Sequence, residues 1–347
     1  MMIKNIGFYK TNHSAIFLKA LIKSPRMPEK NPKNPKEENV VILGAGIAGL
    51  TAALYNARAN LSPLVVTGLA EGGQLMLTTN VENYPGFPEG IQGPELMDRI
   101  KKQTERFGAR FVSGDVDFFE AKKGRITVGV GGRKITAKAA IIATGASART
   151  LGIESEKKYW ARGIHTCAVC DGYFYKGKDV IVVGGGDSAA EDSLFLSKLA
   201  KSITIVVRSD KMKASKIMQD RVKSSKMIKF LWNTEVREFL GDGKVLTGVK
   251  LINNKTNQIT ERKINGVFLA IGQIPNTKVF QGKVELTDYG FVKTDSRLRT
   301  SIEGVFAAGD VMDPLYKQAA TAAGTGCAAA IEVERHINSL RHLERIK

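Results

Sequence analysis

The 347-residue chain is 43% hydrophobic and carries a formal net charge of +18 at pH 7. This length is sufficient for two domains with large cores. No apolar run approaches the roughly eighteen residues that a membrane helix requires, so we expect no membrane partner. The charge alone is compatible with nucleic acid, anionic lipid or acidic partners. Because the basic residues are mixed with acidic ones and form no stripe with aromatic residues, we expect no nucleic-acid partner.

Cysteine usage and the first 38 residues bear on location. Three cysteines, two of them in one motif, argue against a secreted disulfide framework and favour a reducing, cytoplasmic compartment. Residues 1–38 hold seven Lys and one Arg against three Glu and are rich in Pro and Asn. We interpret them as a flexible basic arm, because such a composition resists regular structure. An organelle transit peptide and a true start at Met27 are alternatives that the sequence leaves open.

The folded part opens with a nucleotide-binding pattern. An apolar strand at 39–43 leads into the turn Gly44-Ala-Gly46-Ile-Ala-Gly49, which is followed by a helix at 50–59 and a strand at 64–66. In this context the glycines allow a pyrophosphate to approach backbone N–H groups at a helix N-terminus. The second strand ends in Thr67-Gly68, where an acid is expected on the ribose, so the adenosine end must be held differently.

Two further segments of this region have the composition of ligand contacts. The loop 72–94 contains Gly72-Gly-Gln-Leu75 and Glu82-Asn-Tyr-Pro85, and a loop of this length inside a compact domain usually contacts a ligand. A helix is expected at about 94–107. The stretch 139–147 predicts a buried strand that ends in a turn of small residues, Thr144-Gly-Ala-Ser147, where a cofactor can approach closely.

A pair of cysteines lies between two nucleotide patterns, in the motif Cys167-Ala-Val-Cys170-Asp171. Two thiols separated by two residues on a turn into a helix can close a small disulfide ring, and the local field can make one of them a thiolate. We therefore predict dithiol redox chemistry. Zinc is the alternative, but it needs four ligands, and the remaining thiol, Cys327, and the four histidines are scattered. A purely structural disulfide here would constrain very little chain.

The second nucleotide unit copies the first. A strand at 178–183, the turn Gly184-Gly-Gly-Asp-Ser-Ala189, a helix at 190–199 and a strand at 203–207 follow in order. Two such units imply two nucleotides in one chain. Arg208 follows the last strand, Lys213 comes shortly after, and no acid stands at the strand end. Cations at this place suit the 2′-phosphate of NADP better than the ribose of NAD, and a solvated basic turn is the alternative.

The last part of the chain contains one more predicted strand and helix with candidate cofactor contacts. Gly304-Val-Phe-Ala-Ala-Gly309 predicts an apolar strand, and Asp310 behind it is placed to bind a cofactor hydroxyl. A final helix of small residues is expected at 318–330, with Cys327 packed among alanines.

From about residue 39 onward, the order and spacing of these motifs resemble the low-molecular-weight, bacterial-type thioredoxin reductases. The resemblance implies an α/β fold of two doubly wound, Rossmann-like nucleotide-binding domains, the second inserted into the first. The FAD domain would comprise 39–148 and 276–347, and the NAD(P)H domain with the cysteine pair would comprise 149–275. The crossing strands are expected at 148–151 and 272–276. Members of the family are homodimers that pass electrons from NADPH through FAD to the cysteine pair and on to thioredoxin, with a hinge at the crossing strands.

The resemblance also implies roles for individual residues. Cys170 resembles the thiol nearest the flavin, Cys167 the thiol that attacks thioredoxin, and Asp171 the acid that handles the proton. The residues implied for FAD are Gly44, Gly46, Ala48, Gly49, Gly73, Gln74, Asn83, Thr144, Gly145, Gly309, Asp310, Gln318 and Ala319. Those implied for NADPH are Gly184, Gly186, Asp187, Ser188, Ala189, Arg208 and Lys213.

One departure from the family pattern affects the electron donor. The family's basic cluster after the second nucleotide strand contains a histidine and three arginines, whereas this chain has Val207, Arg208, Ser209 and Lys213 at these places. Two cations remain, so NADPH is the expected donor. NADH or another donor, and a small redox protein other than thioredoxin, are the alternatives.

Overall fold

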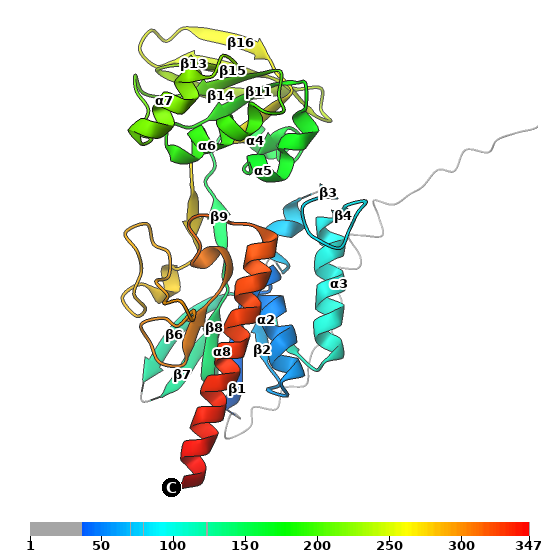
Figure 1. The fold of residues 1–347 in the computed structure, drawn as a ribbon, viewed down its shortest axis with the longest axis vertical. Helices are drawn as coiled ribbons and strands as arrows, with labels where there is room; N and C mark the ends of the chain where they lie inside the picture. The colour runs from blue at the N-terminus through cyan, green and yellow to red at the C-terminus, as the bar shows by residue number, and fades with distance from the viewer. Residues whose placement is uncertain (1–36, 70, 79, 123, 347) are drawn as a thin grey trace, which may run out of the picture. The chain divides into compact units, whose positions relative to one another are not determined.

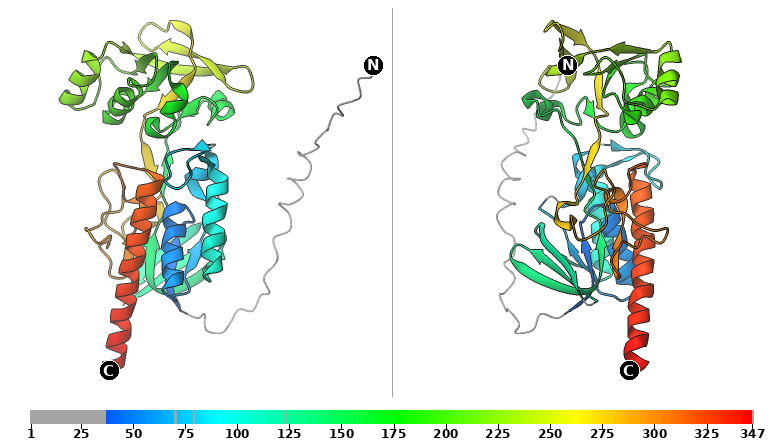
Figure 2. Two further views of the ribbon diagram at one scale, coloured as in Figure 1. Left: turned by 45° about the vertical axis from the view of Figure 1, so that its right-hand side comes forward. Right: turned by 90° about the vertical axis from the view of Figure 1, so that its left-hand side faces the viewer.

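The computed structural model describes residues 37–69, 71–78, 80–122 and 124–346. The predicted basic arm, with the transit-peptide and start-site alternatives, lies outside these residues except for Glu37 and Glu38. The described part contains two sheets with parallel strands at their centres, as Figures 1 and 2 show. The predicted α/β fold class is thereby confirmed.

The larger sheet has seven strands in the order β5-β2-β1-β8-β7-β6, with β19 also paired to β8. The pairs among β5, β2, β1, β8 and β19 are parallel, and β7 and β6 continue the sheet antiparallel. The strands are β1 (Glu38–Leu43), β2 (Leu64–Val66), β5 (Arg110–Val112), β6 (Val116–Lys122), β7 (Arg125–Val130), β8 (Arg133–Ile142) and β19 (Val305–Ala307).

Alternate side chains of β1 enter two different cores. Val40 and Ile42 pack with the helices on one face, whereas Val41 and Leu43 pack with Phe119 on the other. The side chains of these four residues are fully buried. A continuous apolar run is typical of a parallel strand that is covered on both faces, which is why this segment could be predicted as a central strand.

Three helices cover the first face, namely α2 (Ile47–Arg58), α3 (Gly93–Arg106) and α8 (Ala319–Ile346). The views in Figures 1 and 2 show α2 and α8 side by side. Gly326 allows their backbones to approach closely, since a Cβ atom at this position would lie only 2.3 Å from the Ala48 carbonyl oxygen. Asn56 fixes the pair further, since its Nδ2 donates to the Ala330 carbonyl at 2.8 Å.

The final helix is much longer than predicted. It was expected to end at residue 330 but continues to Ile346. The sequence changes there from alanine-rich to charged, yet it contains no Gly or Pro that would stop a helix. Val333 and Ile337, four residues apart, remain fully buried, so one face of the extension still packs on the core.

The second sheet has five parallel strands in the order β10-β17-β11-β12-β13. A three-stranded antiparallel sheet, β14-β15-β16, packs beside it through a shared core that includes Ile181 and Phe239. The strands are β10 (Ile164–His165), β11 (Asp179–Val183), β12 (Ser202–Val206), β13 (Ile228–Leu231), β14 (Thr234–Gly241), β15 (Leu246–Asn253), β16 (Ile259–Lys263) and β17 (Gly266–Leu269). The helices are α4 (Glu154–Tyr159), α5 (Ala168–Asp171), α6 (Asp187–Leu196) and α7 (Lys216–Ser224).

Short elements complete the chain. The long loop predicted at 72–94 contains three of them, η1 (Gly73–Leu77), β3 (Asn80–Val81) and β4 (Ile91–Gln92). The other three lie later in the chain and are η2 (Gly172–Tyr175), η3 (Lys278–Phe280) and η4 (Gly309–Val311).

Two antiparallel strands, β9 (Ala146–Ala148) and β18 (Gln273–Pro275), carry the chain between the two sheets. Asn276 braces their ends, since its Nδ2 donates to the Thr144 carbonyl at 2.9 Å and the Thr144 hydroxyl donates to the Asn276 carbonyl at 2.8 Å. The second crossing strand lies within the predicted 272–276. The first begins two residues before the predicted 148–151 and ends at Ala148, because the small residues of this turn pair directly with β18. The domain boundaries at 148 and 276 stay a prediction.

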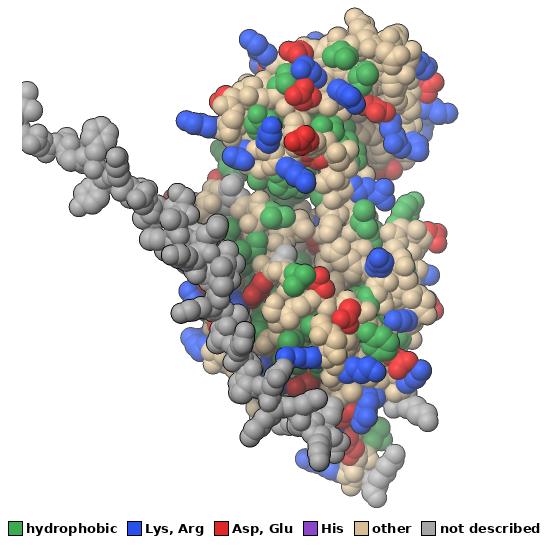
Figure 3. Space-filling model, turned by 180° about the vertical axis from the view of Figure 1, so that it is seen from behind, with side chains coloured by type: hydrophobic (Ala, Val, Ile, Leu, Met, Phe, Trp, Pro, Cys, Tyr) green, Lys and Arg blue, Asp and Glu red, His purple; other side chains and the backbone are tan. Residues whose placement is uncertain are grey.

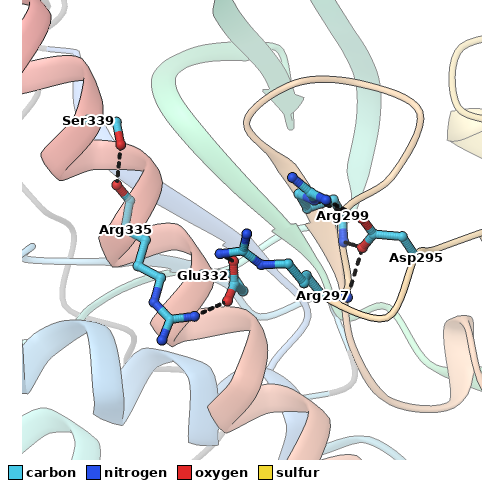
Figure 4. A network of polar contacts seen from close by, with 6 residues as sticks. All are labelled: Asp295, Arg297, Arg299, Glu332, Arg335 and Ser339. Carbon is cyan, nitrogen blue, oxygen red and sulfur yellow. Dashed lines mark hydrogen bonds and ion pairs between the residues drawn. The ribbon is translucent and has the colours of Figure 1, made fainter.

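Surface charges are mixed in sign. In Figure 3, Lys and Arg side chains lie among Asp and Glu over the face shown. Figure 4 shows one network, in which Glu332 of α8 accepts from Arg297 at 2.7 Å and from Arg335, while Asp295 pairs with Arg299 at 2.7 Å. The Arg297–Glu332 pair ties the loop before β19 to α8.

None of the helices in the described ranges combines the length and the apolarity needed to cross a membrane.

Candidate active site

The first glycine turn connects β1 to α2. Gly44 has φ +117°, and a Cβ atom there would lie 2.2 Å from the Ala143 carbonyl oxygen, so this position accepts only glycine. The helix begins at Ile47, three residues before the predicted start, and Gly46 caps it with extended backbone. The free N–H groups of the first turn of α2 are therefore presented beside Gly46, as an anionic pyrophosphate requires.

A cavity of about 1080 Å³ opens beside this turn. It brings together all predicted FAD residues except Gly49, together with all three predicted catalytic residues. The lining residues from these two sets are Gly44, Gly46, Ala48, Gly73, Gln74, Asn83, Thr144, Gly145, Cys167, Cys170, Asp171, Gly309, Asp310, Gln318 and Ala319. Gly49 instead packs inside the turn, where a Cβ atom would lie 1.9 Å from the Gly44 carbonyl oxygen. The volume is at the upper end of the range for small-molecule sites.

The residues of the cavity fit a flavin dinucleotide. The glycine turn supplies a close approach for a pyrophosphate, and Asp310 supplies an acceptor for a hydroxyl. Burial raises the pKa of Asp310 to about 6, with Asp313 adding to the rise and Lys317 opposing it. A buried carboxyl group without a fixed cation is costly unless a donor reaches it, and a cofactor hydroxyl is such a donor. Thr67 and Gly68, at the end of β2, also line the cavity.

The cysteine pair sits at the edge of this cavity. Cys167 and Cys170 are joined by a disulfide, as dithiol chemistry requires. Cys167 precedes α5, and the Cys170 backbone N–H donates to the Cys167 sulfur at 3.1 Å. A donor aimed at this sulfur stabilises its thiolate form once the pair is reduced.

Gln318 connects the cavity to both sulfurs. Its Nε2 donates to the Cys167 sulfur at 3.7 Å, and its Oε1 lies 3.7 Å from the Cys170 sulfur, where it can accept from the thiol of the reduced pair. Asn83 Nδ2 donates to the same Oε1 at 3.3 Å. The sequence suggested Gln318 as a cofactor contact, and its approach to the sulfurs was not predicted.

His165 was also missed. It was considered only as a scattered histidine in the zinc alternative, but it lies on β10 with Nδ1 3.1 Å from Asp171 Oδ2. Its position two residues before Cys167 was visible in the sequence. Without the β10–β17 pairing, however, no pattern shows that its ring faces the carboxylate of Asp171.

The second glycine turn, between β11 and α6, repeats the geometry of the first. Gly184 has φ +150°, and a Cβ atom there would lie 2.4 Å from the Ala270 carbonyl oxygen. The helix starts at Asp187, three residues before the predicted start, so Ser188 and Ala189 lie in its first turn and Gly186 precedes it. Asp187 Oδ1 accepts from the Ser215 backbone N–H at 2.9 Å and from its hydroxyl at 2.8 Å. These bonds lower the pKa of Asp187. They also anchor the start of α7, because Ser215 directly precedes this helix.

The predicted 2′-phosphate cations are exposed beside this turn. Arg208 and Lys213 both follow β12, and the Lys213 backbone N–H donates to the Gly185 carbonyl at 2.7 Å, which holds the loop against the turn. Asp210, the acid that could weaken a phosphate site, lies 4.0 Å from Lys255 instead. The predicted NADPH residues thus gather around one turn, and none of them lines the 1080 Å³ cavity.

Comparisons with known proteins define the class. Residues 38–326 match the family model described as pyridine nucleotide-disulphide oxidoreductase, so the chain belongs to this family. Within the family, the predicted resemblance to bacterial-type, low-molecular-weight thioredoxin reductases is confirmed. The thioredoxin reductase of Mycolicibacterium smegmatis is 50% identical over 298 residues, which cover 86% of this chain and 96% of that protein. That of Coxiella burnetii is 44% identical over 315 residues, 88% of this chain and 98% of that protein.

Solved structures agree with this assignment. The thioredoxin reductase from Streptococcus pyogenes has a TM-score of 0.85 at 39% identity, covering 88% of this chain and all of that one. The Lactococcus lactis thioredoxin reductase in its FR conformation has a TM-score of 0.60 at 37% identity, covering 87% of this chain and all of that one.

Proposed function

We propose that this protein is an FAD-dependent NADPH:thioredoxin-disulfide oxidoreductase. The observation that carries the proposal is the placement of a reducible cysteine pair on the rim of the cavity that fits a flavin dinucleotide. FAD, when bound, accepts two electrons from a reduced nicotinamide and delivers them to a disulfide.

The chain's own residues perform the exchange with thioredoxin. Cys167 attacks the disulfide of the partner, because the Cys170 N–H stabilises its thiolate. Cys170 then attacks the Cys167 sulfur and releases the partner in its dithiol form. Asp171, which lines the same cavity edge, moves the proton between the cysteine pair and the departing thiolate.

The nicotinamide site lies at the second glycine turn. Gly184 and Gly186 allow the pyrophosphate to approach α6, and Arg208 with Lys213 binds the 2′-phosphate that distinguishes NADPH from NADH. Both cations are exposed, and Asp210 is drawn toward Lys255, which supports the preference for NADPH.

A rotation of residues 149–275 about β9 and β18 gives the nicotinamide and thioredoxin alternating access to the flavin and the cysteine pair. Two observations support this proposal. Gln318 reaches both sulfurs across the junction, so the cysteine pair here faces the flavin cavity. The Streptococcus pyogenes and Lactococcus lactis structures have almost equal identity to this chain, 39% and 37%, but TM-scores of 0.85 and 0.60. A rigid-body displacement of one domain lowers a global score in this way.

Anaerobic titration tests the function. The purified yellow protein should lose its flavin absorbance with NADPH and regain it when an oxidised bacterial thioredoxin is added. A Cys170→Ser protein should still be bleached by NADPH but should fail to reduce thioredoxin, because the second attack is lost. Normal turnover in this variant would remove the cysteine pair from the mechanism.

Assembly and location stay predictions. We propose a homodimer, as the family resemblance implies, and light scattering of the purified protein tests this directly. The cytoplasmic location rests on cysteine usage alone.

A further inference from the structure

A relay of hydrogen-bonded polar side chains, formed by His165 and Tyr175, extends from the catalytic acid Asp171. His165 Nδ1 is 3.1 Å from Asp171 Oδ2, and His165 Nε2 is 2.7 Å from the Tyr175 hydroxyl. The side chain of His165 is only 9% exposed and that of Asp171 19%. Each polar atom of the imidazole therefore has one partner, and one of these partners reaches the cavity that holds the cysteine pair.

Three elements hold this chain in place. His165 lies on β10, Asp171 ends α5, and Tyr175 ends η2. The imidazole ring packs between Tyr175, at 5.3 Å between ring centroids, and Phe268 of β17, at 5.5 Å. This aromatic packing fixes the ring plane, so both nitrogens stay aligned with their partners.

Among the described residues, charged groups near this relay come from the residue before β11, from α6 and from the segment before α8. Lys178 lies 5.5 Å from the Tyr175 ring centroid. Burial raises the pKa of Asp192 of α6 to about 7, while the Ala168 backbone N–H of α5 and Lys317 oppose the rise. Burial, with the nearby Asp171 charge, raises the pKa of Tyr175 to about 12, so the tyrosine keeps its proton. Of the two polar partners of His165, Asp171 is the one that lines the cavity with the cysteine pair.

The chemistry of these groups fixes the order of donors. An ionised carboxylate only accepts, so His165 Nδ1–H donates to Asp171, and Nε2 accepts from the Tyr175 hydroxyl. If Nε2 takes up one proton, His165 becomes an imidazolium between the Asp171 carboxylate and the Tyr175 hydroxyl. Both hydrogen bonds are kept, because the Tyr175 hydroxyl can rotate and accept from Nε2–H. The imidazole can therefore take up one proton without losing a hydrogen bond, which makes it the group that can store a proton for Asp171.

We propose that His165 is a positioning and proton-relay residue that supplies Asp171 with the proton needed during thioredoxin reduction. This inference rests on the proposed function and deepens it, because it assigns a source to the proton that Asp171 transfers.

The exchange balances with this reservoir. The Cys167 thiolate forms a bond to one sulfur of thioredoxin, the thioredoxin disulfide breaks, and the departing thiolate takes the proton held by the His165–Asp171 pair. Cys170 then bonds to Cys167 and displaces the second thioredoxin sulfur, which receives the Cys170 thiol proton through Asp171. Over the two steps, two electrons and two protons pass to thioredoxin, and the two cysteines end as a disulfide.

The experiment isolates this exchange. The holoenzyme is reduced with dithiothreitol, desalted without oxygen and mixed in a single turnover with an oxidised bacterial thioredoxin, at pH values from about 5 to about 9. The variant is His165→Asn, whose amide can still donate to Asp171 but cannot carry an extra proton. We expect thioredoxin reduction to slow by about tenfold or more at pH 8 and by less than about threefold at pH 5. These losses are smaller than the roughly 10²- to 10⁴-fold contribution of a direct general acid, because Asp171 remains in place.

A second disulfide substrate distinguishes a proton-relay role of His165 from a structural role. An aromatic nitrobenzoate disulfide releases a thiolate that is stable without a proton, so His165→Asn should reduce it at the wild-type rate. His336→Asn, which changes a half-buried histidine on α8, is the matched control and should leave both reactions unchanged. If His165→Asn does not fold, Tyr175→Phe probes the same chain from its other end and should show a smaller loss with the same pH trend.

The outcomes are distinct. Equal slowing of the variant with both disulfides and at every pH would mean a structural role and overturn the inference. Wild-type rates with thioredoxin across the whole pH range would overturn it as well, while the proposed function would stand. A wild-type protein that reduces the aromatic disulfide but never thioredoxin would overturn the proposed function, and the inference with it.

Discussion

The turns after β1 and β11 share one backbone design but differ in their surroundings. In both, a positive-φ glycine lies against the carbonyl of a neighbouring strand, Ala143 in the first and Ala270 in the second. The helix α2 buries eight of its twelve residues against α8 and the sheet, whereas α6 buries four of its ten. The first turn opens on the 1080 Å³ cavity, and the second is flanked by exposed cations. This difference supports the proposal that the first turn holds a cofactor that stays bound and the second a nucleotide that must exchange.

Replacing these two glycines should give the largest effects and separate the two turns. Gly44→Ala places a Cβ atom 2.2 Å from a backbone oxygen in a core element. We expect a loss of about 3 to 5 kcal/mol in folding free energy and little bound flavin. Gly184→Ala should keep its flavin but lose reduction by NADPH. Flavin absorbance per protein and thermal unfolding measure both, and equal flavin loss in the two variants would refute the division of roles.

Arg208→Ala sharpens the description of the second turn. A charge-assisted hydrogen bond contributes about 1.5 to 3 kcal/mol, so the KM for NADPH should rise by about tenfold or more. The KM for NADH should change by less than about twofold. Steady-state kinetics with both donors provide the measurement, with Arg221→Ala on α7 as a control for loss of one exposed cation. An equal change with NADPH and NADH would remove the phosphate assignment.

Asp310→Asn tests the first turn through pH. Because burial raises the pKa of Asp310 to about 6, this carboxyl group gains a proton as the pH falls through that value. The ionised form is the better acceptor for a cofactor hydroxyl, so FAD binding should weaken below about pH 6, by at most about tenfold per pH unit. The asparagine variant should bind FAD more weakly at pH 8 and show no such dependence. Fluorescence titration of the apoprotein follows this, and an unchanged pH profile would contradict it.

Gln318→Leu should have the smallest effect, at the junction of the two regions. It removes the amide that reaches both sulfurs. A single net hydrogen bond contributes about 0.5 to 1.5 kcal/mol, so reduction of the cysteine pair should slow by roughly two- to fivefold with an unchanged KM for NADPH. Rapid alkylation of the newly formed thiols gives the rate, and Gln281→Leu on the same cavity wall is the control. Unaltered kinetics would show that the contact does not hold the pair in place.

The sequence predicted what depends on local pattern. Both glycine turns, the cysteine pair and the buried strands are defined by spacing and hydrophobicity, and the structure has them within a few residues. The helices α2 and α6 both start three residues early, because the last residues of each motif already belong to the first helical turn. The predicted end of α8 at residue 330 is wrong because the charged residues that follow the alanines also favour a helix.

What could not be predicted depends on contacts between distant segments. Gln318 lies 151 residues from Cys167, and only the crossing of β9 and β18 brings the two together. His165 meets Asp171 because the pairing of β10 with β17 turns the imidazole toward α5. Side-chain direction at such points is set by tertiary packing, for which one sequence offers no local signal.

The pairing of Ala148 with Gln273 puts the entrance and the exit of residues 149–272 on adjacent strands, about 5 Å apart as in any antiparallel pair. A segment whose two ends meet in this way can be removed and replaced by a tight hairpin without displacing its host. The same geometry allows the larger sheet to carry a whole second nucleotide-binding unit through one pair of strands, with its own strand order uninterrupted.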